Sequence, residues 1–262
     1  MILSLAQIDI TLGDRAANLE RARPLAAEAA RRGSDLLVLP ELCTTGYDLE
    51  RAAELGEPLD GYTARTLCGW AQAHKLWITG SFLLRQGDQV RNAAPLFGPG
   101  GEILGPYAKI HRFGPMAEDR WLAAGDAPGL FDLPWGRAGL AICYDLRFPE
   151  LFRTLALAGA TLILLPSEWP HPRLAHWRTL IRARAIENQC FVAAVNRVGS
   201  DRSNTFCGHS ALIDPWGETV IEAGEGEALL TATIDLAQVE DIRRRIPVFA
   251  DRRPACYDLI GY

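Results

Sequence analysis

The sequence predicts an α/β fold built as a four-layer α-β-β-α sandwich, in which two mixed sheets pack face to face and helices cover both outer sides. Apolar strands alternate with helical segments in the first part of the chain and again in its middle. Such strands need a sheet that helices cover. Runs of consecutive strands interrupt this alternation and add antiparallel edges. A single doubly wound sheet is the alternative architecture.

The helices are predicted from apolar residues that recur at the helical period and from the residues that stop them. The first predicted helix is closed by Gly33 and contains Pro24, where a kink is expected. The predicted helices cover residues 15–32, 62–74, 148–158, 173–188 and 236–245.

The strands are predicted from short apolar or alternating runs bounded by turn residues. DLLVLP, residues 35–40, is a continuous apolar run, typical of a strand covered on both faces. The predicted strands cover residues 2–8, 35–40, 76–84, 89–98, 102–107, 129–133, 137–142, 161–165, 190–196, 208–214, 218–222 and 228–234. Because no linker-like stretch, low-complexity segment or repeat divides the chain, we expect a single domain over residues 1–262.

The composition excludes several classes of protein. Among 262 residues, 27 Lys and Arg stand against 32 Asp and Glu, so the net charge of -5 lacks the basic surface that nucleic-acid binding uses. The longest apolar runs, near residues 36–39 and 162–165, are too short to span a membrane. The opening MILSLAQIDI has no features of a signal peptide, so a cytoplasmic location is expected.

The cysteines and histidines do not form a recognisable metal site. The six cysteines contain no CxxC pair and are too sparse for a disulfide framework, so free thiols are expected. His171 and His176 are five residues apart rather than four, and no acidic cluster accompanies them. Neither a metal nor a cofactor is predicted.

Three residues at the ends of predicted strands, and a fourth in the loop that follows one of these strands, are candidates for chemistry. Cys143, in AGLAICYDLRFPE (residues 138–150), occupies a strand-to-helix turn, where a nucleophile is exposed near free backbone N–H groups. The alternative is a buried, inert cysteine. A thiol needs a base or a cation nearby. Glu41 follows a buried strand, and Lys109 ends another and opens the loop that holds Glu118. Each of these three is otherwise a solvated surface charge. His176 is the weaker candidate for a Cys-His pair.

Three motifs in this order, LPELCTTGY (39–47), YAKIHRF (107–113) and CYDLRFPE (143–150), resemble the nitrilase superfamily of carbon–nitrogen hydrolases. The resemblance implies a Glu-Lys-Cys triad of Glu41, Lys109 and Cys143. It also implies a supporting role for Glu118, behind which Gly125-Asp126 fits the family pattern. Arg112 departs from that pattern, since a leucine is frequent there.

The resemblance also implies a mechanism. Glu41 acts as general base for Cys143, which attacks an amide or nitrile carbon and forms a thioester. Lys109 and the backbone N–H of Tyr144 hold the developing oxyanion. Lysine is a compact ammonium that arginine cannot replace in the same space.

The segment 166–189 resembles the branch that includes ω-amidases, which act on terminal amides of 2-oxo dicarboxylic acids such as 2-oxoglutaramate. Arg173, beside Trp169, is the residue expected to bind the substrate carboxylate. An aliphatic amide, an N-carbamoyl amino acid or a nitrile is an alternative substrate. A metal-dependent phosphoesterase and a non-catalytic binding protein are alternative classes. The resemblance also implies a homodimer or larger even oligomer, with the tail 240–262 at the interface.

Overall fold

The computed structural model describes residues 1–257, and its strands form two mixed sheets. The strands of the first sheet are β1 (Ile2–Gln7), β2 (Leu36–Val38), β3 (Trp77–Thr79), β4 (Phe82–Gln86), β5 (Gln89–Phe97), β6 (Ile103–Ala108) and β13 (Ala228–Thr233). Their order is β13-β1-β2-β3-β5-β4, with β6 also paired to β5. The parallel pairs β1-β2 and β2-β3 lie in the middle, and antiparallel pairs flank them.

The second sheet has six strands in the order β12-β11-β10-β9-β8-β7. They are β7 (Gly129–Leu133), β8 (Gly136–Leu140), β9 (Leu162–Ser167), β10 (Phe191–Asn196), β11 (Ala211–Ile213) and β12 (Thr219–Glu222). Here β8, β9 and β10 are parallel to one another, and the outer pairs are antiparallel.

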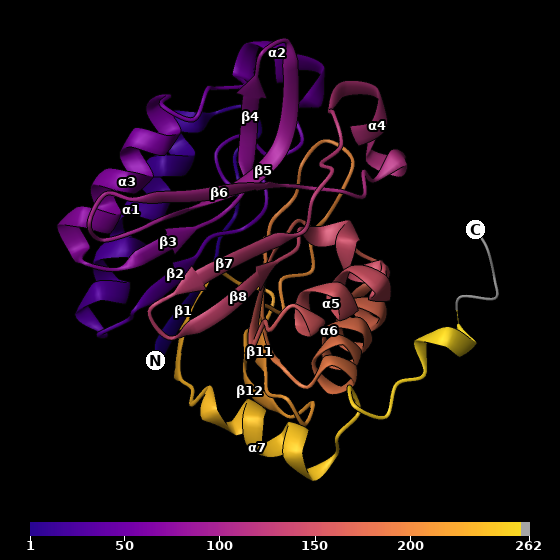
Figure 1. Ribbon diagram of the computed structural model, residues 1–262. Coiled ribbons are helices and arrows are strands. Elements are labelled where there is room, and N and C mark those ends of the chain that lie inside the picture. The colour runs from indigo at the N-terminus through magenta and orange to yellow at the C-terminus, as the bar shows by residue number, and fades with distance from the viewer. Residues whose placement is uncertain (258–262) are drawn as a thin grey trace.

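Helices cover the two outer faces. The α-helices are α1 (Arg15–Arg31), α2 (Ala52–Leu55), α3 (Tyr62–His74), α4 (Glu118–Trp121), α5 (Pro149–Leu157), α6 (Leu174–Asn188) and α7 (Ala237–Arg245). Figure 1 shows α1 and α3 outside the first sheet, and α5 and α6 outside the second. The four-layer prediction is therefore confirmed. The helix α1 continues through Pro24.

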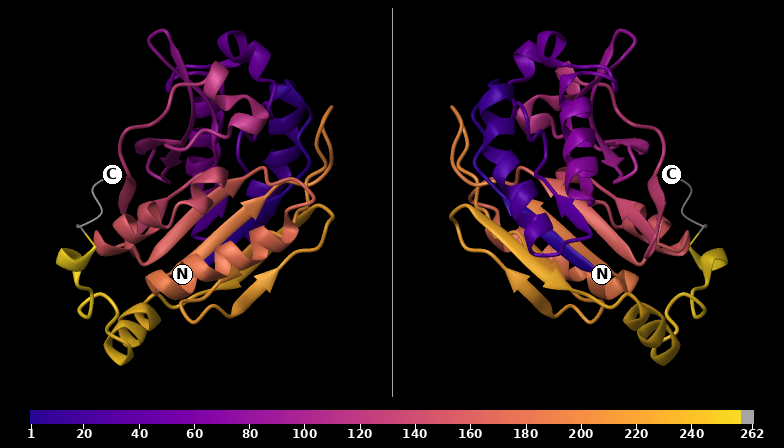
Figure 2. Two further views of the ribbon diagram at one scale, coloured as in Figure 1. Left: turned by 90° about the vertical axis from the view of Figure 1, so that its right-hand side faces the viewer. Right: turned by 90° about the vertical axis from the view of Figure 1, so that its left-hand side faces the viewer.

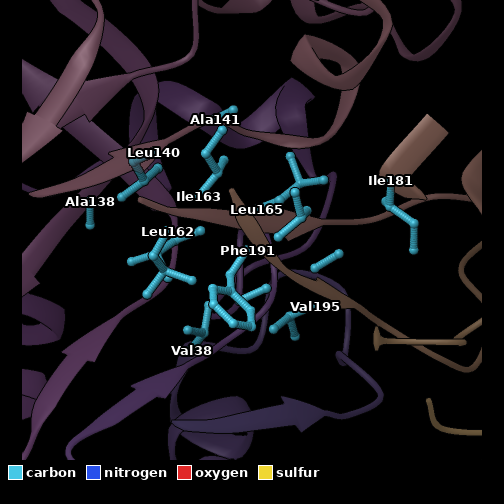
Figure 3. Packing of buried hydrophobic residues seen from close by; sticks show 14 of the residues in the cluster. Val38, Ala138, Leu140, Ala141, Leu162, Ile163, Leu165, Ile181, Phe191 and Val195 are labelled. Atoms are coloured by element: carbon cyan, nitrogen blue, oxygen red, sulfur yellow. The ribbon is translucent and has the colours of Figure 1, made fainter. Parts of the chain in front are cut away.

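Alternation along the central strands builds two separate apolar layers, because successive side chains of a strand point to opposite faces. Leu36 and Val38 of β2 face the second sheet, whereas Leu37 between them packs with the helices that cover the first sheet. Figure 3 shows Val38 packed with Leu162 and Phe191 of the second sheet. This packing holds the two sheets together and brings their carboxyl-terminal strand ends to one edge of the sandwich.

The prediction of one strand over residues 76–84 is wrong, because β3 and β4 are separate and Gly80 and Ser81 lie between them. A side chain at Gly80 would sit 2.7 Å from the Leu39 Cβ, so only glycine lets the two segments approach this closely. The backbone here bonds to residues 39–43 rather than continuing a ladder. The short helices at 49–55 and 118–121 were not predicted, and the strand expected over 208–214 is only Ala211–Ile213.

The C-terminal helix lies at the surface of the molecule. Figure 2 shows α7 and the yellow segment after it on the outside of the sandwich. Among the described residues, no helix is long and apolar enough to cross a membrane. All six cysteines are free, as expected.

Candidate active site

The loop after β2 places Glu41 at the edge of the sandwich. Ser81 holds this loop through its side chain and its backbone: the Leu42 N–H donates to Ser81 Oγ at 2.8 Å, and the Cys43 N–H donates to the Ser81 carbonyl at 2.9 Å. The break between β3 and β4 therefore has a function in the fold, because it frees Ser81 to hold the segment that carries Glu41.

Lys109 directly follows β6, and its own backbone is held on both sides. Its N–H donates to the Asn92 carbonyl at 2.9 Å, and its carbonyl accepts from the Gly125 N–H at 2.9 Å. A side chain at Gly125 would collide with the Ala108 carbonyl, which explains why glycine occupies this position. The Lys109 side chain points into the protein and is 2% exposed.

Glu41, Lys109 and Glu118 form one buried cluster. Lys109 Nζ lies 2.8 Å from Glu41 Oε1 and 2.8 Å from Glu118 Oε2. Tyr47 and Asn92 complete it, donating to Glu41 Oε1 at 2.9 and 2.7 Å. Three donors converge on Glu41 Oε1. The other oxygen, Oε2, accepts one bond, from the Glu168 N–H at 2.8 Å, and can still accept from another group.

The electrostatics of the cluster keep the lysine charged. Burial lowers the pKa of Lys109, but the carboxylates of Glu118 and Glu41 outweigh this effect, so the pKa lies above its usual value. Burial raises the pKa of Glu118, Lys109 opposes the rise, and Glu41 adds to it. The site therefore holds a fixed ammonium between two carboxyl groups that compete for it.

Cys143 begins the 3-10 helix Cys143–Arg147 that follows β8, and its backbone is left-handed with a φ of 45°. The residue is 5% exposed. Burial raises the pKa of the Cys143 thiol well above its usual value, and Glu41 raises it further, whereas Lys109 lowers it. The thiol is therefore neutral near pH 7 and needs a base beside it before it can act as a nucleophile.

A small pocket opens over Cys143. Its lining residues are Phe113, Cys143, Tyr144, Arg147, Glu168, Trp169, Pro170 and Arg173. The three residues predicted to meet substrate, Tyr144, Trp169 and Arg173, all lie here. Arg147 also lines the pocket, and its guanidinium lies 4.8 Å from the centre of the Trp169 ring. The Arg173 guanidinium lies 5.6 Å from the centre of the ring of Phe113, another lining residue. The pocket thus combines two arginine cations and the carboxyl group of Glu168 with apolar walls.

Several of these residues were missed by the sequence reasoning. Tyr47 and Arg147 lie inside motifs used for the resemblance, at fixed distances from Glu41 and Cys143, so their positions were available but their contacts were not. Asn92 lies in the middle of a strand and is 2% exposed, and a buried amide in an apolar strand is its only signal. The weaker candidate, His176, lies near Arg147 Nη2 at 3.3 Å, and within residues 1–257 it makes no hydrogen bond to Cys143.

A second buried ion pair lies next to the cluster. Arg197 Nη1 lies 2.9 Å from Glu168 Oε2, and both side chains are fully buried. Among the described residues, Glu168 Oε1 has no hydrogen-bond partner. Burial raises the pKa of Glu168 to about 8, Arg197 opposes the rise and Glu41 adds to it. Glu168 also supplies the backbone N–H that donates to Glu41 Oε2, so its ion pair with Arg197 holds this donor in place.

The fold and the site together define a class of protein. The pattern of the carbon-nitrogen hydrolase family matches residues 2–244, so the chain belongs to this family and is a carbon–nitrogen hydrolase. The family and fold expectations from the sequence are therefore confirmed.

Two of the similar proteins are amidases by name. The chain is 42% identical to 2-oxoglutaramate amidase of Bacillus subtilis, over 97% of this chain and 98% of that one. It is 33% identical to the human omega-amidase NIT2, over 97% and 96%. A solved CN-hydrolase superfamily protein from Xanthomonas campestris, with an arsenic adduct in its active site, matches with a TM-score of 0.91 at 35% identity, covering 97% of each chain.

Proposed function

We propose that the chain hydrolyses the terminal amide of a small carboxylated amide, with 2-oxoglutaramate as the model substrate, through a thioester on Cys143. The observation that carries the substrate class is the pair of guanidinium groups, Arg147 and Arg173, in the pocket over Cys143. Arginine binds carboxylates in a fixed, two-pronged geometry. The names of the relatives at 42% and 33% identity support the same class.

The proposed reaction begins with the thiol. Glu41 accepts the Sγ proton of Cys143, and the thiolate attacks the amide carbon. The carbonyl oxygen becomes an oxyanion, which Lys109 Nζ and the Tyr144 N–H stabilise. When the tetrahedral intermediate collapses, the C–N bond breaks, the proton on Glu41 passes to nitrogen, and ammonia leaves. The acid half of the substrate stays on Sγ as a thioester.

The second half of the reaction restores the enzyme. Glu41 takes a proton from water, which attacks the thioester carbon, and the C–S bond breaks. The thiolate recovers the proton from Glu41, and the carboxylic acid product leaves. Glu118 positions Lys109, because its two oxygens lie 2.8 and 2.9 Å from Nζ. No step requires a cofactor.

Ammonia release and intact-protein mass spectrometry test this proposal on a small panel: 2-oxoglutaramate, glutamine, propionamide, an N-carbamoyl amino acid and a nitrile. We expect ammonia from 2-oxoglutaramate and a transient acyl adduct on Cys143. Full activity of Cys143→Ala would contradict the covalent mechanism. A folded protein that acts on the nitrile or the N-carbamoyl amino acid in preference would move it to another branch of the family.

The carboxylate assignment has its own test. Arg173→Ala and Arg147→Ala should each lower kcat/KM for 2-oxoglutaramate about 10–100-fold, the loss of about 1.5–3 kcal/mol for one charged hydrogen-bonding group, while propionamide hydrolysis changes little. Arg23→Ala is the matched control, since Arg23 is on the surface and its side chain is 62% exposed. If both amides lose activity equally, the arginines do not bind the carboxylate.

We also propose that the protein works as a homodimer or larger even oligomer in the cytoplasm. Large apolar side chains are exposed on the side of α5 and α6 and beside α7, at Leu157, Ile186 and Ile246, which are 44 to 49% exposed. Burying these side chains against a second copy of the chain would remove apolar surface from water. The expected tail 240–262 at this interface includes residues 258–262, which lie outside the described residues. Free thiols favour the reducing cytoplasm.

A further inference from the structure

The carboxylate of Asp145 joins the segment that carries Cys143 to the segment that carries Lys109. Asp145 is two residues after Cys143 and fully buried. Its Oδ2 accepts from the Tyr107 hydroxyl at 2.6 Å, and its Oδ1 accepts from the His111 N–H at 3.1 Å. Tyr107 and His111 are the residues two before and two after Lys109, so one carboxylate bonds to both sides of the lysine.

The same carboxylate closes the turn around the cysteine. Asp145 Oδ2 also accepts from the Ile142 N–H at 2.9 Å, and the Asp145 N–H donates back to the Ile142 carbonyl at 3.0 Å. Both bonds join Ile142 and Asp145, so Cys143 lies within the turn that they close, in its left-handed conformation. That conformation costs a residue with a side chain about 1–2 kcal/mol, so neighbouring contacts must hold it.

His111 extends this set of contacts to the wall of the pocket. Its Nδ1 lies 2.8 Å from Asp145 Oδ1, and its ring stacks on Phe148 with centroids 3.6 Å apart. Phe148 meets Tyr144 edge-on at 5.2 Å, and Tyr144 lies 4.8 Å from Phe113. Because Tyr144 and Phe113 line the pocket, His111 is linked to the surface that would meet substrate.

We propose that Asp145 is a positioning residue for the reaction, holding Cys143 and Lys109 in register, and that His111 carries the same alignment to the aromatic wall of the pocket. This inference rests on the proposed function, in which Cys143 attacks and Lys109 holds the oxyanion. The nucleophile and the oxyanion donor sit on different loops and must act on one carbonyl group. A misplacement of about 1 Å between such groups lowers a rate about 100-fold.

An Asp-His pair beside a cysteine also occurs in sites where the histidine is the base. Here the contacts indicate that His111 is not the base for Cys143. Among residues 1–257, His111 makes no hydrogen bond to Cys143, and the carboxylates that raise the pKa of the Cys143 thiol are Glu41 and Glu118. All four donors aim at Asp145, which suits an ionised carboxylate that only accepts. His111 then donates through Nδ1–H and is oriented by Asp145.

Asp145→Asn is the test variant, because asparagine keeps the shape but accepts through one oxygen only, so two of the four donors face an NH₂ group. Asp132→Asn is the matched control, since the Asp132 side chain is 78% exposed. We expect Asp145→Asn to lower kcat about 100-fold with KM changed less than about threefold. We expect His111→Ala to raise KM and to change kcat less.

Alkylation of Cys143 by iodoacetamide, followed by peptide mass mapping, tests Asp145 whatever the substrate is. The Asp145→Asn protein should react about 10-fold more slowly or worse at pH 7, and Asp132→Asn should match the parent. If Asp145→Asn has parental kcat, KM and alkylation rate, and only its melting temperature falls, Asp145 is structural and the proposal is wrong. If Asp145→Glu restores full activity, charge rather than position is what matters, which also overturns it.

The outcomes separate this inference from the proposed function. Activity in Cys143→Ala would overturn the covalent mechanism, and the alkylation rates would still decide the role of Asp145 in positioning the thiol. If Asp145→Asn does not fold, Tyr107→Phe removes one of the four bonds and takes its place. It should slow alkylation and lower kcat several-fold, and a parental value for both would reject the proposal.

Discussion

Replacing Lys109 by methionine tests the buried cluster most directly. Methionine matches the length of the lysine side chain but carries no charge, so the two ion pairs at 2.8 Å disappear and Glu41 and Glu118 face each other. Removing one partner of a buried ion pair costs about 3–5 kcal/mol. At about 2 °C per kcal/mol for a chain of this size, Tm should fall about 6–10 °C.

The effect of this substitution depends on pH in a defined direction. Burial already raises the pKa of Glu118 in the folded protein, and Lys109 opposes the rise. Without the ammonium that pKa rises further, so protonation stabilises the variant and raising the pH destabilises it. The difference in Tm between parent and variant should therefore grow from pH 5.5 to pH 8.

Differential scanning fluorimetry at both pH values and amide hydrolysis together give the answer. Loss of an oxyanion donor should lower kcat/KM by about 100–1,000-fold in protein that is still folded. Lys75→Met is the matched control, because Lys75 is the other lysine of the chain and is exposed at the end of α3. A variant with Tm within 2 °C of the parent and kcat/KM within tenfold would refute both the buried pairing and the role of Lys109.

Three further outcomes are expected. Raising the pH from about 4.5 to about 8 should lower the free energy of unfolding of the parent, because the raised pKa of Glu168 favours the folded protein with this group protonated. In Glu168→Gln, the free energy of unfolding measured with urea should depend less on pH. Tyr47→Phe removes the 2.9 Å bond to Glu41 and should cost about 1.5–3 kcal/mol in the same assay, with a lower kcat. Leu140→Ala, fully buried in β8, should cost about 2–5 kcal/mol and leave KM unchanged; an unchanged urea midpoint would contradict its place between the layers.

Much of the fold could be predicted from the local spacing of apolar residues. This spacing differs between strands and helices, and buried central strands form continuous apolar runs. The split between β3 and β4 did not follow. Residues 76–84 are apolar enough for one strand, and only the distant loop after β2 shows why Gly80 and Ser81 leave the ladder. Such contacts between segments far apart in sequence have no local signal.

The candidate site was predicted in a different way, from three motifs that resemble one family. Glu41, Lys109 and Cys143 each follow a strand, which is consistent with a shared site because strand ends of one sandwich meet at one edge, but this position alone did not select them. Asn92 and Asp145 could not be assigned, since both act on partners from other segments: Asn92 donates to Glu41, and Asp145 accepts from Tyr107 and His111. Their chemistry is visible only once the sheets are packed.

The place of β1 has a consequence for synthesis of the chain on the ribosome. This strand pairs with β2 on one side and with β13 on the other, where Ile2 lies opposite Thr233. At about 5–20 residues per second, the partner of Ile2 emerges about 10–50 s after it. Throughout that time one edge of the most N-terminal strand is unpaired and can pair with another nascent chain. Neighbouring ribosomes on one messenger therefore bring such unpaired strand edges close together before the last strand of this sheet has been made.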